Sequence, residues 1–213
     1  MKQNSFIHPG ILLCKRGIDL TFSITCLLLT LPLFVVIALS IKATSPGPIF
    51  YCQSRVGKMK VGKVQYFNMI KFRTMVQDAE SATGAVWAQK NDSRLTKIGK
   101  LLRKARLDEL PQFINVIKGE MSLIGPRPER PEIVIKLEQE IPFYSERTYD
   151  MTPGITGLAQ VSQGYDTCID DVKTKIGYDF AYSLSLTKLH SWLLMDLKIM
   201  VKTFLIMVLG RGQ

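Results

Sequence analysis

The chain has 213 residues, and 28 Lys and Arg against 18 Asp and Glu give a formal net charge of +10. This length predicts one compact domain with a substantial core, and the charge implies an anionic partner: nucleic acid, an anionic membrane surface or a phosphate-rich substrate. The cysteines form no CxxC pair, which favours reduced thiols in the cytosol and no metal cluster; they are Cys14, Cys26, Cys52 and Cys168. The absence of P-loop, dinucleotide-binding and zinc spacings disfavours those classes of enzyme.

An uncharged segment, LTFSITCLLLTLPLFVVIALSI, occupies residues 20–41. As a helix it would reach roughly 33 Å, enough to cross a bilayer, and it is too long for a cleavable signal peptide. Pro32 in its middle predicts a break. Basic residues lie on both sides, with Lys15 and Arg16 before the segment and Lys42 after it. Because basic residues mark cytoplasmic ends, this pattern favours a re-entrant helix, although it leaves a spanning helix open.

Two short β-strands are predicted next, at Ile49–Cys52 and Val64–Met69, around a turn at Gly57–Lys63. The second leads into KFRTM, in which Lys71 and Arg73 lie on either side of a phenylalanine. Two such cations are, taken alone, typical of a solvated strand edge.

A polar surface loop is predicted over residues 76–93, and a basic helix over Arg94–Arg106. Apolar residues recur in this helix at helical spacing, at Leu95, Ile98, Leu102 and Ala105. Six other positions are Lys or Arg. The pattern fits either a solvated amphipathic helix or a helix lying on anionic lipid, where each basic residue contributes about 1 kcal/mol; the neighbouring membrane segment favours the second.

An acidic pair, Asp108 and Glu109, precedes Pro111, which fits the first turn of a helix that runs to Lys118. Farther on, GPRPE places Arg127 between two prolines that restrict the backbone to extended geometry. Carboxylates that can hold Mg²⁺, near an arginine that can hold phosphate, indicate phosphoryl transfer. The alternative is that the acidic pair only stabilises the helix, by interacting favourably with the dipole at its N-terminus.

Three more helices and a turn-rich segment complete the prediction: helices at Pro131–Ile141, Asp170–Tyr182 and Leu186–Leu209, and turns at Tyr149–Val161. In the turns, Pro153-Gly154 fits a type II turn and Gly157 permits close backbone approach. The last helix is apolar but interrupted by charges, which predicts an amphipathic helix in the membrane plane rather than a span.

Three motifs in this order, KFRTM, LDELPQFINVIKGEMSLIGPRPE and PGITGLAQV, resemble the bacterial sugar transferase family, the monotopic polyprenol-phosphate phosphoglycosyl transferases. The resemblance implies a mixed α/β, mostly helical fold. Residues 1–43 would hold a re-entrant broken helix, and residues 44–213 a catalytic domain with in-plane amphipathic helices and a small β element at the site. The family's break is carried by a Ser-Pro pair, whereas this chain has Leu31-Pro32; Thr30 or Thr25 could bond the freed carbonyls.

The resemblance also implies a chemistry in which Asp108 is the nucleophile and Glu109, with Asp108, holds Mg²⁺. The residues expected to hold phosphate oxygens are Arg127, Lys71, Arg73 and Arg106. The substrates would be a UDP-sugar and undecaprenyl phosphate, at the cytoplasmic face of the bacterial inner membrane, and UMP would leave. The reaction would initiate assembly of an exopolysaccharide, O-antigen, capsule or glycoprotein glycan.

Two alternatives remain at this point. A membrane-tethered, basic nucleic-acid-binding or scaffold protein would also use the positive charge, but the sequence has no nucleic-acid-binding motif, so no nucleic acid is expected as a partner. A transferase that moves the sugar without its phosphate would release UDP instead of UMP.

Overall fold

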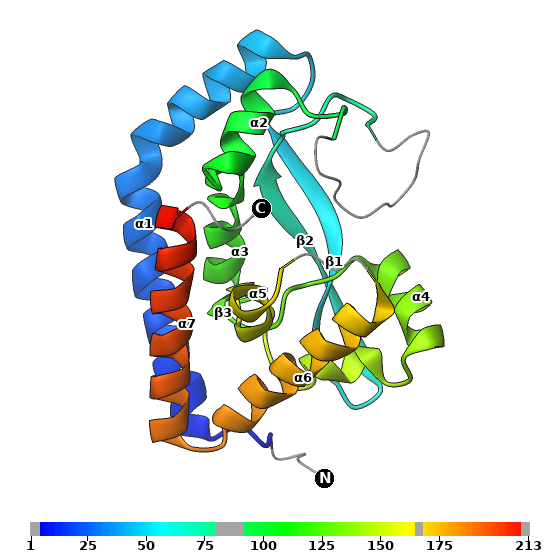
Figure 1. Cartoon of the computed structure of the whole chain (residues 1–213). Coiled ribbons are helices and arrows are strands. Elements are labelled where there is room, and N and C mark those ends of the chain that lie inside the picture. Colours follow the sequence, from blue (N-terminus) through cyan, green and yellow to red (C-terminus); the bar gives the residue numbers. More distant parts are fainter. Residues whose placement is uncertain (1–4, 80–91, 165–167, 210–213) are drawn as a thin grey trace.

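The computed structural model describes residues 5–79, 92–164 and 168–209, which form a mostly helical domain with two small sheets (Figure 1). This confirms the predicted mixed α/β, mostly helical fold. The elements in chain order, with η for 3₁₀ turns, are α1 (Pro9–Thr44), β1 (Phe50–Lys60), β2 (Lys63–Phe72), α2 (Lys97–Lys104), η1 (Leu107–Glu109), α3 (Gln112–Lys118), β3 (Ser122–Ile124), α4 (Pro131–Glu140), η2 (Tyr144–Thr148), β4 (Gly154–Thr156), α5 (Leu158–Ser162), α6 (Ile169–Ser185) and α7 (Leu189–Leu209).

Helix α1 is long and apolar enough to cross a membrane: it has 36 residues, and its most apolar window has a mean hydropathy of 2.7 with 11% of that window buried. The predicted break at Pro32 is wrong, because the helix continues through it and curves along the domain (Figure 1). The hydroxyl of Thr30 donates to the carbonyl of Cys26 at 2.7 Å. The carbonyl that Pro32 deprives of a donor is that of Leu28, so Thr30 does not serve the predicted purpose.

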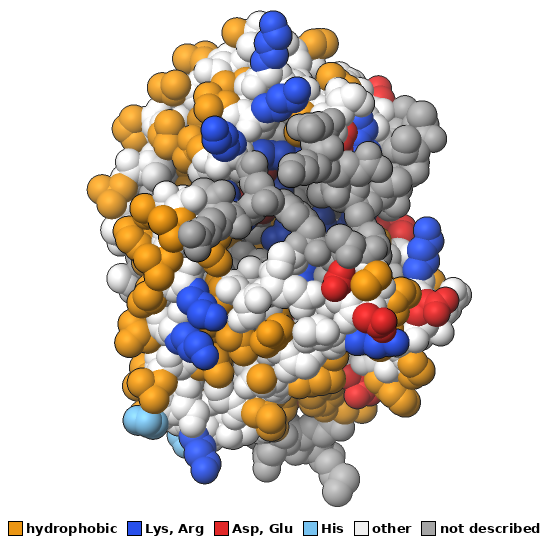
Figure 2. Space-filling view, in the orientation of Figure 1, with side chains coloured by type: hydrophobic (Ala, Val, Ile, Leu, Met, Phe, Trp, Pro, Cys, Tyr) orange, Lys and Arg blue, Asp and Glu red, His pale blue; other side chains and the backbone are white. Residues whose placement is uncertain are grey.

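One side of α1 and the adjoining α7 carry a broad exposed apolar surface, visible along the left edge of the molecule (Figure 2). Leu13 and Leu29 on α1 are each 77% exposed, and Phe204 on α7 is 66% exposed. Soluble monomers rarely expose contiguous apolar patches of this extent. The surface indicates that the protein associates with a membrane.

The opposite side of the N-terminal half of α1 is polar and is fastened to the domain. Arg16 donates to two carbonyls in the last turn of α3, at 2.5 and 2.7 Å. Asp19 accepts from the backbone N–H of Leu123 at 3.0 Å, and Lys15 lies 3.4 Å from Asp196 of α7. These bonds tie the apolar helix to α3 and β3, which follow the acidic pair in the chain, and to α7.

The hairpin of β1 and β2 is longer than the sequence predicted, and its turn is only Val61-Gly62. The predicted turn at Gly57–Lys63 is wrong because the strand runs through Gly57, with an irregularity in the pairing between Val56 and Met59. Such a bulge accommodates an extra residue without ending the strand. Gly62 has φ of +68°, which favours glycine at the true turn.

Helix α2 begins after Thr96, whose hydroxyl accepts from the N–H of Gly99 at 2.9 Å and caps the helix. It therefore starts later than the predicted Arg94. Gly99 lies so close to the backbone of Thr74 that an added Cβ would be 1.9 Å from its carbonyl oxygen. Most of the predicted loop at 76–93 (residues 80–91) lies outside the described residues.

The remaining predicted helices are confirmed as α3, α4, α6 and α7 with small shifts of their ends. In the turn-rich segment, Gly154 lies in β4, parallel to β3, and its φ is not positive. The predicted type II turn there is wrong. Glycine is needed because a Cβ would be 2.1 Å from the backbone nitrogen of Gly125.

We expect Gly154→Ala to lower the stability by about 1–3 kcal/mol, because the added methyl group must push β4 away from Gly125. For a chain of this size that corresponds to a fall in Tm of roughly 2–12 °C. Gly164→Ala is the matched control, since a Cβ there meets nothing within 4 Å. Thermal unfolding in detergent measures both; equal Tm values for the two variants would contradict the expected clash.

Candidate active site

The acidic pair lies in η1, a single 3₁₀ turn between α2 and α3, rather than in the first turn of an α-helix. Arg106, which precedes it, has φ of +55°, so the chain turns sharply at the end of α2. Pro111 then precedes α3 as its N-cap residue. The sharp turn and the buried start of α3 place both carboxylates against the sheet, with Asp108 only 7% exposed.

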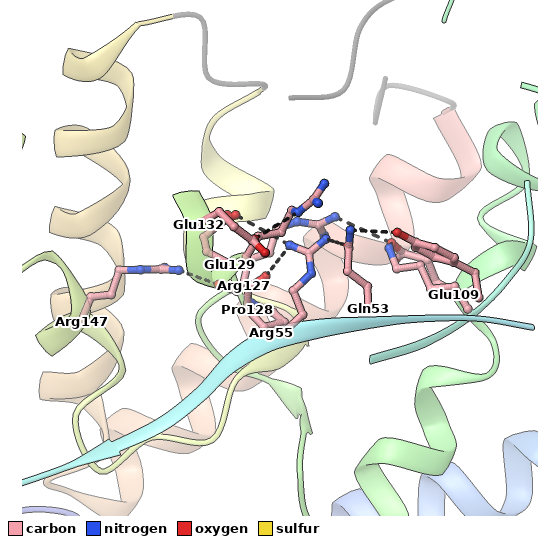
Figure 3. Close-up of polar contacts among 11 residues, drawn as sticks. Gln53, Arg55, Glu109, Arg127, Pro128, Glu129, Glu132 and Arg147 are labelled. Atoms are coloured by element: carbon pink, nitrogen blue, oxygen red, sulfur yellow. Dashed lines mark hydrogen bonds and ion pairs between the residues drawn. The ribbon is translucent and has the colours of Figure 1, made fainter. Parts of the chain in front are cut away.

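Glu109 is the centre of an ion-pair cluster built from three elements. Its carboxylate lies 2.7 Å from Nζ of Lys71 on β2 and 3.8 Å from Nη2 of Arg127 in the loop after β3 (Figure 3). Burial would raise the pKa of Glu109, but these cations outweigh it and lower the pKa to about 2. Burial lowers the pKa of Lys71, and Glu109 opposes that shift. The structure thus brings the side chains of Lys71, Glu109 and Arg127 together.

Asp108 has a different electrostatic environment from its neighbour. Burial raises its pKa, the charge of Glu109 raises it further, and Lys71 and Arg103 oppose the increase. Arg103 is on α2, for which the sequence indicated only a basic amphipathic helix, either solvated or lying on anionic lipid. Its position in the sequence, five residues before Asp108, did not indicate that the two side chains would interact. They do so because Arg106, which lies between them with a left-handed backbone, turns the chain sharply.

Arg73 has a structural role that its sequence motif did not indicate. It is 6% exposed, and its guanidinium donates to the carbonyls of Ser45 and Pro46 and to the hydroxyl of Ser45. It thereby fixes the chain just after α1, so we leave it out of the proposed phosphate site. Arg106 stays in it, because its charge contributes to the lowered pKa of Glu109.

The loop that carries Arg127 is fixed by backbone contacts from two sheets. The N–H of Gly154 donates to the carbonyl of Pro126 at 2.9 Å, and the N–H of Val56 donates to the carbonyl of Glu129 at 2.8 Å. The PGITG segment therefore borders the site through its backbone. A pocket adjoins the other side of the loop, between it and α6, and is lined by Arg127, Glu129, Tyr144, Arg147, Ala159, Gln160, Val172, Lys175, Ile176 and Asp179.

The two carboxylates of Asp108 and Glu109 would hold Mg²⁺ only together with further ligands from a bound substrate. No cluster of three or more His, Cys, Asp or Glu residues able to hold a metal occurs in the part of the chain that the structure describes. Mg²⁺ commonly takes one or two protein carboxylates and completes its octahedron with phosphate oxygens and water. Asp108 and Glu109 supply such a pair beside cations that suit a diphosphate.

Comparison with known proteins gives one consistent result. The chain is 44% identical over 198 residues to the UDP-N-acetylgalactosamine-undecaprenyl-phosphate N-acetylgalactosaminephosphotransferase of Aeromonas hydrophila, covering 93% of this chain and 44% of that protein. It is 49% identical over 133 residues to a putative undecaprenyl-phosphate N-acetylgalactosaminyl 1-phosphate transferase of Bacillus subtilis, covering 62% of this chain and 72% of that protein. It is 40% identical over 182 residues to the UDP-glucose:undecaprenyl-phosphate glucose-1-phosphate transferase of Xanthomonas campestris, covering 84% of this chain and 35% of that protein.

The chain thus spans less than half the length of the Aeromonas and Xanthomonas relatives. The family model described as bacterial sugar transferase matches residues 11–210. This match includes nearly all of α1, the acidic pair, the Arg127 loop and all of α7. The chain belongs to the bacterial sugar transferase family.

Proposed function

We propose that this protein transfers a sugar 1-phosphate from a UDP-sugar to undecaprenyl phosphate and thereby initiates assembly of a cell-surface glycan. The observation that carries the proposal is the buried Asp108-Glu109 pair facing Lys71 and Arg127. The relatives named above are transferases of this kind for N-acetylgalactosamine 1-phosphate and glucose 1-phosphate. Because those sugars differ, the donor sugar of this chain is left open.

In the first step a carboxylate oxygen of Asp108 attacks the β-phosphorus of the UDP-sugar. The bond from that phosphorus to the bridging oxygen breaks, UMP leaves, and the sugar phosphate remains on Asp108 as an acyl phosphate. In the second step an oxygen of undecaprenyl phosphate attacks the same phosphorus and releases the Asp108 carboxylate. The products are undecaprenyl diphosphate sugar and the free enzyme.

The cations of the site make this approach of two anions feasible. Arg127 can bind phosphate oxygens bidentately, and Lys71 and Arg106 add positive charge beside it. By pairing with Glu109, Lys71 and Arg127 are also held in place before substrate arrives. When bound at Asp108 and Glu109, Mg²⁺ would supply further neutralisation of the diphosphate.

The attachment of α1 at both ends supports a re-entrant arrangement. Near its N-terminus Arg16 bonds to α3, and near its C-terminus Ile37 and Ile41 pack with Phe72 and Leu102. A helix whose two ends contact one catalytic domain leaves that domain on one side of the membrane. We place that side at the cytoplasmic face, with basic α2 and the apolar side of α7 lying in the membrane surface.

We expect cysteine labels at both ends of α1 to react from the same, cytoplasmic side. His8→Cys and Ala43→Cys are suitable because both positions are exposed; each is made in a variant without the four native cysteines. An impermeant maleimide applied to intact spheroplasts and to lysed cells reports the side. Protection of one label and labelling of the other in intact cells would establish a spanning helix instead.

Release of UMP tests the proposed activity directly. Purified protein in detergent is given Mg²⁺, undecaprenyl phosphate and a panel of UDP-sugars. UMP formed with a single sugar identifies reaction and donor together. UDP in place of UMP would indicate transfer of the sugar without its phosphate, and salt-sensitive binding of RNA or DNA without turnover would favour a nucleic-acid-binding protein.

A further inference from the structure

Four consecutive carbonyl groups in the Arg127 loop each accept a hydrogen bond from a different residue. Pro126 and Pro128 have no N–H, so this loop cannot form a regular ladder and must obtain donors from elsewhere. Two donors are backbone N–H groups and two are arginine side chains. The pairs are Gly154 N to Pro126 O at 2.9 Å, Arg147 Nη2 to Arg127 O at 2.6 Å, Arg55 Nη1 to Pro128 O at 3.0 Å, and Val56 N to Glu129 O at 2.8 Å.

Arg147 is itself held by a buried partner. Its other terminal nitrogen donates to the carboxylate of Asp179 on α6 at 2.5 Å, and the two side chains are 7% and 2% exposed. The guanidinium also lies over the ring of Tyr144, 4.9 Å from its centroid. Each side of the guanidinium fork thus has a fixed acceptor, so it joins α6 to the backbone of Arg127. Figure 3 shows the bond from Arg147 to the loop.

The side chain of Arg127 points the other way, toward Glu109, and is 44% exposed (Figure 3). Its Nη2 lies 3.8 Å from the carboxylate of Glu109, which is farther than a hydrogen bond. The position of the Arg127 backbone decides from where its side chain reaches the acidic pair, so the bond that holds the Arg127 carbonyl also directs the guanidinium. In phosphoryl transfer a misplacement of about 1 Å can lower the rate roughly 100-fold.

We propose that Arg147, held by Asp179, is a positioning residue that aims Arg127 at the substrate diphosphate, with Arg55 supporting the next carbonyl of the loop. The inference rests on the proposed function, since it concerns the same site. Arg147 and Asp179 touch neither Asp108 nor Glu109 in the described contacts, and they act through the backbone of Arg127.

The test separates positioning from simple stability. Removing Asp179 alone would leave a buried, unpaired guanidinium and destabilise the fold, whereas apolar replacement of both members of a buried ion pair is often neutral. We therefore compare the double variant Arg147→Met, Asp179→Leu with wild type. The expected result is an unchanged Tm and a kcat/KM for the UDP-sugar lowered about 10- to 100-fold, the range that loss of one charge-assisted hydrogen bond gives.

A double-mutant cycle that adds Arg127→Gln distinguishes positioning of Arg127 from a purely structural role. The quantity compared is the loss of kcat/KM in the presence and absence of Arg127. If Arg147 and Asp179 act by aiming Arg127, their replacement should have little further effect once Arg127 is gone. An equal loss of kcat/KM in both backgrounds, or no loss in the wild-type background, overturns the inference. Should the double variant fail to fold, Arg147→Lys, which keeps the charge but not the fork, goes through the same cycle.

UMP release by the wild-type enzyme distinguishes a failure of the positioning role from a failure of the proposed function. UMP release by wild type together with additive losses in the cycle overturns the positioning role alone. Absence of UMP release by wild type with every UDP-sugar overturns the proposed function, and this inference with it.

Discussion

Asp108→Asn should lower kcat by about 10⁴-fold or more, the scale seen when an enzyme loses its nucleophile. The amide preserves the size of the side chain in its 7% exposed position but cannot form an acyl phosphate. Binding of the UDP-sugar should change little, because the cations Lys71 and Arg127 are untouched. Steady-state UMP release gives kcat, and titration calorimetry gives donor affinity.

A burst experiment checks the role of Asp108 more closely. Wild type given UDP-sugar without undecaprenyl phosphate should release about one UMP per enzyme and stop, because the sugar phosphate stays on Asp108. Asp108→Asn should give no burst. Asp170→Asn is the matched control, since Asp170 is an exposed aspartate (86%) at the start of α6. Substantial turnover or a full burst from Asp108→Asn would remove Asp108 as the nucleophile.

Arg127→Gln should have the second largest effect, a loss of about 100-fold or more in kcat/KM. The change removes the planar cation that can bind the diphosphate bidentately and takes one positive charge from beside Glu109. The variant should fold normally because the carbonyl groups of the loop keep their hydrogen bonds. Initial rates at several UDP-sugar concentrations measure the effect.

Two further variants show whether charge or shape matters at this position. Arg127→Lys keeps the charge and should recover only part of the loss, because an ammonium cannot bind two oxygens in one plane. Lys136→Gln, a change of an exposed cation on α4, should leave the rate unaltered. Wild-type kcat/KM in Arg127→Gln would show that the diphosphate is held by other residues.

Much of the local structure could be read from sequence because its causes are local. Pro111 and Pro131 lie where α3 and α4 begin, and helical spacing of apolar residues predicted α6 and α7. The hairpin was predicted with the wrong turn, since glycine and lysine at 57–63 have the composition of a turn. Whether a strand continues through them depends on pairing across the sheet, which composition does not encode.

Roles of single arginines were harder to predict. Arg73 and Arg127 each lie within one of the family's motifs, yet Arg73 is bonded to the chain after α1 and Arg127 points at Glu109. Arg103 and Arg147 had no motif at all. The role of a guanidinium depends on which acceptors surround it, and these acceptors come from distant parts of the chain.

The sequence by itself determined the family, the acidic pair, the rigid Arg127 loop and the apolar N-terminal helix, because each is a contiguous pattern with a local physical meaning. Only the tertiary structure decided which cations face Glu109, and that α1 passes through Pro32 and is fastened at both ends to one domain. Those properties depend on burial and on contacts between residues about 20 to 100 positions apart, which exist only once the chain has folded.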